Sequence, residues 1–171
     1  YLINLTPLRV GVGKEQPLGA TSDLTLLKIR LPSGEWYPYI PGSSLKGALR
    51  SLAESILSAC GMRVHNPWEY TIIDDEAKRN DYCLICGIFG STRIASHVRV
   101  YDSYPEGNSV FTFSKTGVGI SRDFGGSHPR ILYTEELVVP YTRWKFMMDI
   151  INIRVFPNPG DERGKLLRQL L

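Results

Sequence analysis

The chain has 171 residues, 43% of them hydrophobic and 22% charged, a composition that excludes a disordered tail and is sufficient for one domain. No apolar run reaches the roughly 18 residues of a membrane-spanning helix, and the N-terminus lacks the basic and then apolar pattern of a secretory signal. The net charge of +3 allows a polyanionic partner without requiring one. We therefore expect a cytoplasmic protein that does not bind a membrane.

The first elements are predicted to be extended. Apolar residues that alternate loosely predict one strand over 2–12 and another over 24–31, with a polar loop containing glycine and proline over 14–23. A turn is predicted at 32–34, and 37–41 is too rich in proline for a central strand. This part of the chain should therefore contribute strands and loops but no helix.

A helix is predicted after Pro41 and as far as Gly61, because glycine is typical of a helix end. Ser43 and Ser44 are candidates to cap its N-terminus. The residues expected on its buried face recur at helical spacing: Leu45, Leu49, Leu52, Ile56 and Leu57.

The middle of the chain, over 61–110, is acidic, whereas the segments on either side are basic. Its first part, 62–87, shows no clear periodicity, so we expect it to be irregular and an insertion rather than core. Short strands are expected at 98–101 and 110–113.

The C-terminal third is predicted to hold strands and then a helix. A loop rich in Gly and Ser over 115–126 precedes a strand over 131–139. The alternation over 144–155 indicates one long strand with a bulge near Ile150. A helix is predicted over 162–171, and its inward residues are expected to be Leu166, Leu167, Leu170 and Leu171.

The resulting order is strand, helix, strand, strand, helix, which is that of an α+β, ferredoxin-like fold without its closing strand. The chain also begins at Tyr1 without a Met and ends at Leu171 in an apolar run. We therefore expect it to be part of a longer protein.

The start of the predicted helix is the segment richest in chemistry. Gly42, Ser43 and Ser44 precede or open the helix, where free backbone N–H groups and the helix dipole favour an anion. Lys46 and Arg50 are spaced i and i+4, so both lie on one helix face and could bind a phosphate backbone. The alternative is a well-capped helix with a solvated basic face.

Three cysteines, an odd number, argue against a secreted disulfide framework. Cys83 and Cys86 form a C-x-x-C pair, which is half of a zinc site, and Cys60, His65 and His97 are candidates for the remaining ligands. We take His65 as the expected third ligand of a structural zinc ion. The alternative is a pair of small buried thiols.

The chain contains Gly42-x-Ser44-x-Lys46-Gly47-x-x-Arg50 behind Tyr39-Ile-Pro41, and later Cys83-x-x-Cys86-Gly-Ile-Phe-Gly90-Ser. Together these two motifs resemble the RAMP superfamily of CRISPR-associated proteins. The chain is most similar, over about 10–155, to the repeated backbone subunit of type III effector complexes, which are RNA-guided machines that target RNA. It departs from them in lacking a Gly-rich loop near its C-terminus.

The resemblance implies a single modified ferredoxin-like, RRM-like domain over 1–171, with an inserted helical lobe over 62–97 and a thumb β-hairpin over 114–140. It also implies partners: guide RNA, target RNA, copies of the same subunit and other effector subunits. Lys115 and Arg122 belong to the expected thumb and are expected to contact RNA. The alternative for the hairpin is an ordinary surface excursion.

Asp23 is the residue that the resemblance connects to catalysis. In related backbone subunits an aspartate at this place is required for cutting target RNA, and Asp23 would act with a divalent ion such as Mg²⁺ or Mn²⁺. Such an enzyme would be an endoribonuclease within a multi-subunit complex. One alternative is a turn or cap residue in a subunit that only binds and assembles. Another is a relative that processes precursor guide RNA, but no histidine is suitably placed for that role.

Overall fold

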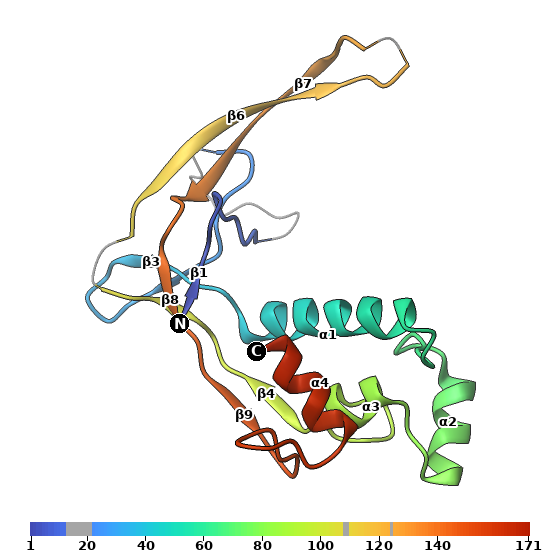
Figure 1. Cartoon of the computed structure of the whole chain (residues 1–171). Helices are drawn as coiled ribbons and strands as arrows, with labels where there is room; N and C mark the ends of the chain where they lie inside the picture. The colour runs from blue at the N-terminus through green and yellow to red at the C-terminus, as the bar shows by residue number, and fades with distance from the viewer. Residues whose placement is uncertain (13–21, 108–109, 124) are drawn as a thin grey trace. The chain divides into compact units, whose positions relative to one another are not determined.

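The computed structural model describes residues 1–12, 22–107, 110–123 and 125–171, with the backbone alone for 127–131. The chain divides into two compact units, each built from two separate segments. The first unit comprises 1–40 and 102–146, and the second comprises 41–101 and 147–171. The described residues form a mixed α+β structure with small antiparallel sheets (Figure 1).

The first unit contains a three-stranded antiparallel sheet in the order β1 (Leu2–Ile3), β8 (Arg143–Lys145) and β5 (Tyr104–Pro105). Trp144 at its centre is almost fully buried, and its indole Nε1–H donates a hydrogen bond of 2.9 Å to the Asn4 side-chain oxygen. A buried indole N–H needs such a partner, so Asn4 fixes the ring.

A second pair, β2 (Lys28–Arg30) and β3 (Trp36–Pro38), is joined by the predicted turn at 32–34. The long strands predicted over 2–12 and 24–31 are wrong along most of their length. Beyond β1 and β2 these segments form only isolated bridges, such as Leu8 with Val138. Pro7 interrupts the first segment because proline has no N–H for a ladder.

The longest ladder joins β6 (Thr112–Ile120) and β7 (Ser127–Val138), drawn in Figure 1 as an extended two-stranded ribbon. The loop predicted over 115–126 is therefore wrong in its first half. Glycine did not prevent strand formation here. The ring of Tyr133, on the facing strand, lies over Gly117, and a Cβ atom on Gly117 would collide with this ring. Cross-strand packing thus replaces the side chain that Gly117 lacks.

The second unit holds the helices of the described chain: α1 (Gly42–Ala59), α2 (Tyr70–Arg79), α3 (Leu84–Phe89) and α4 (Glu162–Leu170). β4 (Val98–Val100) pairs with β9 (Met148–Ile150) in the same unit. Its core is a continuous cluster drawn from α1, α3, β4, α4, the N-cap of α3 and the segment after β9: Ala53, Leu57, Cys83, Ile85, Cys86, Ile88, Phe89, Val98, Ile153, Val155, Leu166 and Leu167.

The helix predicted after Pro41 is confirmed as α1, which ends two residues before Gly61. Neither Ser43 nor Ser44 caps it, because both lie inside the helix and the Pro41 carbonyl accepts from the N–H groups of Ser44 and Leu45. Gly42 is buried where a Cβ atom would meet the Val100 carbonyl. This glycine is thus required by close packing of the α1 start on the end of β4.

The expectation that 62–87 is irregular is wrong, because this segment contains α2 and the start of α3. Both helices are short and depend on tertiary packing more than on their own propensity. Ile73 of α2 and Ile85 of α3 are fully buried, and Asn80 ends α2 in the left-handed conformation. The apolar residues were too few and too widely spaced to show a helical period.

The long strand predicted over 144–155 is interrupted at 146–147, where the chain passes from the first unit to the second. The helix predicted over 162–171 is confirmed as α4, in which Leu166 and Leu167 are buried. Leu171 is exposed, contrary to expectation, because it follows the last helical residue. The ferredoxin-like arrangement and the division into lobe and thumb stay predictions.

Candidate functional site

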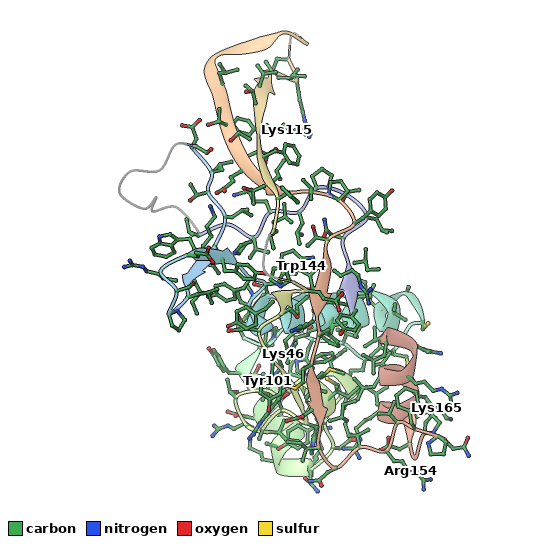
Figure 2. All side chains as sticks on the ribbon, turned by 90° about the vertical axis from the view of Figure 1, so that its left-hand side faces the viewer. Lys46, Tyr101, Lys115, Trp144, Arg154 and Lys165 are labelled. Atoms are coloured by element: carbon green, nitrogen blue, oxygen red, sulfur yellow. The ribbon has the colours of Figure 1, made fainter. Side chains whose placement is uncertain are left out.

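The predicted RNA-binding residues between Gly42 and Arg50 lie at the start of α1, in the second unit. Ser43 and Ser44 are exposed, and Lys46 is partly buried. Burial and the neighbouring Arg50 guanidinium lower the pKa of Lys46. Figure 2 labels Lys46 among the side chains of α1. A partly desolvated ammonium near a helix N-terminus interacts strongly with an anion, because solvent screens it less.

Arg50 is held by two internal partners. Its Nε donates to Glu54 Oε1 at 2.8 Å, and one terminal nitrogen donates to the Gly90 carbonyl oxygen at 3.0 Å. Only 17% of the side chain is exposed. Arg50 therefore fastens α1 to the end of α3, which leaves Lys46 as the better phosphate contact of the predicted pair.

Asp23 lies on the first unit, attached to the hairpin. Its Oδ2 atom accepts hydrogen bonds from the Thr134 backbone N–H at 2.7 Å and from the Thr134 hydroxyl at 3.1 Å. Leu24 continues the attachment through backbone bonds to Thr134 and Glu136 on β7. The predicted loop before Asp23 includes 13–21, which lies outside the described residues.

Lys115 and Arg122 lie on the same hairpin. Lys115 is opposite Glu135 in the ladder, one position from the Thr116–Thr134 pair. Because successive side chains alternate across a strand, Lys115 points to the face opposite Thr134 and the bound Asp23. Figure 2 labels Lys115 on the hairpin. Arg122 is exposed in the turn between β6 and β7.

Four side chains of the second unit converge in the interior: His65, Glu76, Cys83 and Cys86. They are all buried, and their possible ligand atoms lie within 4.8 Å of one another. His65 Nε2 is 3.1 Å from Glu76 Oε2, 3.3 Å from Cys83 Sγ and 3.6 Å from Cys86 Sγ. The structure therefore brings together the three residues expected at a zinc site and adds Glu76.

Sequence reasoning missed Glu76 because an acidic residue on a short helix usually faces solvent. The available signal was its spacing, since Ile73 and Glu76 are three residues apart and both are fully buried on one face of α2. The alternative ligands are elsewhere: Cys60 is exposed, and His97 Nδ1 lies 2.9 Å from the Ile151 carbonyl oxygen.

The electrostatics of this cluster favour a thiolate at Cys83 and a neutral thiol at Cys86. Hydrogen bonding from the Cys86 thiol lowers the pKa of Cys83 to about 6, and the same bond together with burial raises the pKa of Cys86. Burial opposes a positive charge on His65, but the Asn66 carbonyl and the neighbouring Cys83 and Glu76 raise the pKa of the imidazole. The site thus concentrates negative charge around one histidine.

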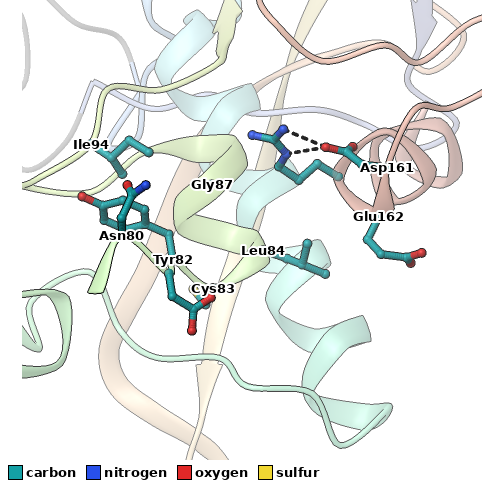
Figure 3. Close-up of a pocket in the computed structure, with 10 residues that line it drawn as sticks. Asn80, Tyr82, Cys83, Leu84, Gly87, Ile94, Asp161 and Glu162 are labelled. Carbon is teal, nitrogen blue, oxygen red and sulfur yellow. Dashed lines mark hydrogen bonds and ion pairs between the residues drawn. The ribbon is translucent and has the colours of Figure 1, made fainter. Parts of the chain in front are cut away.

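A pocket of about 480 Å³ lies beside Cys83, between α3 and the first turn of α4 (Figure 3). Arg163 and Asp161, which both line the pocket, form an ion pair of 2.7 Å, and dashed lines mark it at Asp161 in Figure 3. Asp81 and Glu162 also line it. Acidic side chains outnumber basic ones there, so this pocket does not suit a phosphate group.

A wider pocket on the first unit is lined by Tyr37, Tyr104 and Lys145 among others. Tyr104 stacks on Tyr39 with ring centroids 5.8 Å apart. Aromatic rings beside a cation are the lining that single-stranded nucleic acids use, through base stacking and phosphate attraction.

Comparison with known protein families decides the family. The model of the RAMP superfamily matches residues 2–171. The chain belongs to the RAMP superfamily. It is thus a CRISPR-associated RAMP protein, and this membership suggests an effector subunit that binds RNA. A search of curated proteins found no match to this RAMP protein. Within its described residues, no helix is both long and apolar enough to span a membrane.

Proposed function

We propose that this RAMP protein is a guide-RNA-binding backbone subunit of a type III CRISPR complex that targets RNA. The observation that carries the proposal is the start of α1, where Lys46 lies within the first turns of an 18-residue helix. The helix dipole and one ammonium group attract phosphate without reading bases. Such contacts suit a protein whose sequence specificity comes from base pairing between guide and target.

The fold expected of such a subunit belongs to the same proposal. It comprises an RRM-like, modified ferredoxin domain over 1–171 with a helical lobe over 62–97 and a thumb over 114–140. The α2 and α3 helices lie within the proposed lobe, and the β6–β7 hairpin spans the proposed thumb. Lys115 and Arg122 are then the residues of the thumb that would bind RNA phosphates.

For target cleavage we propose that Asp23 assists attack by the RNA's own 2′-hydroxyl. The 2′-oxygen forms a bond to the adjacent phosphorus, the bond to the 5′-oxygen breaks, and the 2′-hydroxyl proton passes to solvent or to the carboxylate. The leaving 5′-oxygen takes a proton from water. The protein's part is to hold the nucleotide and place one carboxylate beside it.

A divalent ion such as Mg²⁺ would stabilise the charge on the reacting phosphate. Among the described residues, the one group of three or more His, Cys, Asp or Glu side chains arranged for a metal is the buried cluster around His65, not a group around Asp23. Mg²⁺ binds readily through one carboxylate together with phosphate oxygens and water. Asp23 therefore fits an ion that is brought largely by the RNA.

A second candidate is a subunit of the same kind that binds and assembles without cutting. The bonds from Thr134 to the Asp23 carboxylate favour it, because they are what an aspartate with a purely structural role would make.

The test is reconstitution of the complex with guide RNA, target RNA and Mg²⁺, using the wild-type chain and Asp23→Ala. If the subunit cleaves through Asp23, the wild-type complex should make regularly spaced cuts that need the divalent ion. The Asp23→Ala complex should make no cuts but should retain guide RNA. Unchanged cutting by Asp23→Ala removes Asp23 from the mechanism. Guide retention without any cutting by the wild-type complex supports the non-cleaving alternative.

A further inference from the structure

We propose that the tyrosine pocket, lined by Tyr37, Tyr104 and Lys145 among others, binds one unpaired nucleotide of RNA and prefers guanine as its base. This inference rests on the proposed function, because it takes RNA as the partner. It concerns a separate contact, however. Lys46 belongs to the second unit, whereas the residues that line the tyrosine pocket all belong to the first.

The tyrosine pocket has the size and the stability of a small-ligand site. Its volume is about 600 Å³, within the range of roughly 300–1,000 Å³ that is typical of such sites. The lining comes from the β2–β3 hairpin and from β5, β8 and the residues next to them. The Tyr37 hydroxyl donates a hydrogen bond to the Gly107 carbonyl oxygen, which joins the hairpin to the segment after β5. The pocket is therefore formed before a ligand arrives.

Tyr104 supplies a surface on which a base can stack. Its ring lines the pocket and is itself stacked on Tyr39, with ring centroids 5.8 Å apart and an angle of 22° between the planes. The contact with Tyr39 restricts the orientation of the Tyr104 ring, so little order is lost when a base binds. Stacking on an aromatic side chain is available to any nucleobase, because every base has a π-face.

Lys145 supplies a positive charge beside that ring. It lies directly opposite Tyr104 in the β5–β8 ladder, and residues opposite each other in an antiparallel pair project from the same face. Lys145 is exposed and forms no ion pair within the part of the chain that the structure describes. The neighbouring Arg143, by contrast, is paired with Glu106 at 3.0 Å. The Lys145 ammonium is thus available for the phosphate next to a stacked base.

Glu35 gives the tyrosine pocket its base preference. Burial and the negative charge of Glu35 raise the pKa of the Tyr37 phenol, so the carboxylate lies near that ring. Guanine has two adjacent N–H donors on its Watson–Crick edge, at N1 and N2, which match the two oxygens of a carboxylate. Adenine, cytosine and uracil each present acceptors beside a single donor group there, and an acceptor is repelled by the carboxylate.

A segment of another protein complements the pocket less well. A lysine or arginine side chain would be attracted by Glu35 but repelled by Lys145, and an acidic side chain would meet the reverse. An unpaired nucleotide carries N–H donors on its base edge and a negative charge on its phosphate. It therefore complements both charged residues of the pocket at once.

The experiment measures the binding of single-stranded RNA to the 171-residue chain by fluorescence anisotropy. The three RNAs have about twelve nucleotides each. One contains only uridine, the second has a single guanosine at its centre, and the third has inosine there, which lacks only the N2 amino group. The wild type should bind the guanosine RNA about tenfold more tightly than the inosine RNA, because one hydrogen bond to a carboxylate is lost. The uridine RNA should bind more weakly still. Equal affinity for all three would overturn the proposal.

Substitutions of Tyr104 test the stacking. Tyr104→Ala should weaken binding of the guanosine RNA about tenfold, whereas Tyr104→Phe retains a ring and should bind like the wild type. Tyr141→Ala is the matched control, because Tyr141 is an exposed tyrosine of the same unit outside the pocket. Urea unfolding checks that each variant is folded. Undiminished binding by folded Tyr104→Ala, or equal losses in Tyr104→Ala and Tyr141→Ala, would overturn the stacking role.

Substitutions of the two charged residues test the pocket without disturbing its aromatic rings, since both side chains are exposed. Glu35→Gln should bind the guanosine and inosine RNAs with nearly equal affinity. Lys145→Ala should weaken all three RNAs and reduce the slope of log K against log salt by about 1. A guanosine preference that persists in Glu35→Gln would overturn the role of the carboxylate, and an unchanged slope in Lys145→Ala would overturn the phosphate contact.

Lys46→Ala separates this pocket from the proposed contact at α1. It should weaken the binding of all three RNAs to the same extent and leave the preference for guanosine unchanged. If Lys46→Ala has no effect while Tyr104→Ala weakens binding, the contact at α1 fails and the tyrosine pocket stands. If Lys46→Ala weakens binding while Tyr104→Ala does not, the tyrosine pocket fails and the proposed function stands.

Discussion

Thr134 holds the Asp23 carboxylate with both its backbone N–H, at 2.7 Å, and its hydroxyl, at 3.1 Å. The same hydroxyl oxygen accepts from the Asp23 N–H at 3.1 Å. The direction of the carboxylate is therefore set by the β7 strand of the hairpin. If Asp23 cleaves RNA, the hairpin that carries Lys115 also positions the cleaving group.

We expect Thr134→Val to slow target cleavage about tenfold without changing guide binding. The substitution retains the backbone bond but removes the hydroxyl, and a hydrogen bond to a charged group is worth about 1.5–3 kcal/mol. The measurement is the single-turnover cleavage rate of the reconstituted complex. Thr116→Val, on the facing strand, is the control and should cleave normally. Equal rates for Thr134→Val and the wild type would show that the hydroxyl does not position Asp23.

Two glycines of α1 should respond to alanine in opposite directions. Gly42→Ala places a Cβ atom against the Val100 carbonyl and should lower the free energy of unfolding by about 1–3 kcal/mol. Gly47→Ala meets no atom within 4 Å and should raise it by about 0.5–1 kcal/mol, because alanine favours the helix. Urea unfolding measures both. A neutral Gly42→Ala would contradict the close packing of the α1 start on β4.

Asp161 should make the stability of α4 depend on pH. It caps the helix through a bond of 2.9 Å from the Gly164 N–H, and this bond, aided by Arg163, lowers the pKa of the carboxyl below 3.8. A lowered pKa in the folded state gives stability that is present above the ordinary pKa and lost as the pH falls through the folded value. The contribution should therefore begin to fall near pH 4 and be lost once the pH is below the lowered pKa of Asp161.

Two variants separate the cap from its charge. Asp161→Ala removes the cap and should cost about 1 kcal/mol at pH 7. Asp161→Asn retains a capping oxygen, so it should cost less at pH 7 and equal the wild type in strongly acid solution. Urea unfolding at a series of pH values tests this. A constant difference between Asp161→Asn and the wild type at every pH would contradict the charge effect.

The parts of the fold with strong local signals could be predicted from the sequence. α1 and α4 have helical spacing over several turns, and the Cys83–Cys86 spacing indicated a possible metal site. α2 could not be predicted in this way, because its buried face rests on two residues, one of them charged. The burial of this helix face is explained by the contact of Glu76 with His65, two residues that are eleven positions apart.

The hairpin shows the same limit. Gly117 and Gly119 indicate a loop when only neighbours in sequence are considered, but β7 supplies the pairing and the Tyr133 ring that make the segment a strand. The internal partners of Arg50 were also beyond sequence reasoning, since Gly90 is forty residues away. The spacing placed Lys46 and Arg50 on one helix face, but it did not show that Arg50 already binds partners within the protein.

The most direct test of the proposed function is the salt dependence of RNA binding by wild-type, Lys46→Ala and Lys165→Ala chains. Lys165 is an exposed lysine of α4 paired with Glu162, and it serves as the control. We predict that RNA of any sequence binds the wild type, and that Lys46→Ala weakens binding and reduces the slope of log K against log salt by about 1. Lys165→Ala should match the wild type. A wild-type chain that does not bind RNA, or a Lys46→Ala chain with unchanged affinity and slope, would contradict the proposed RNA contact at α1.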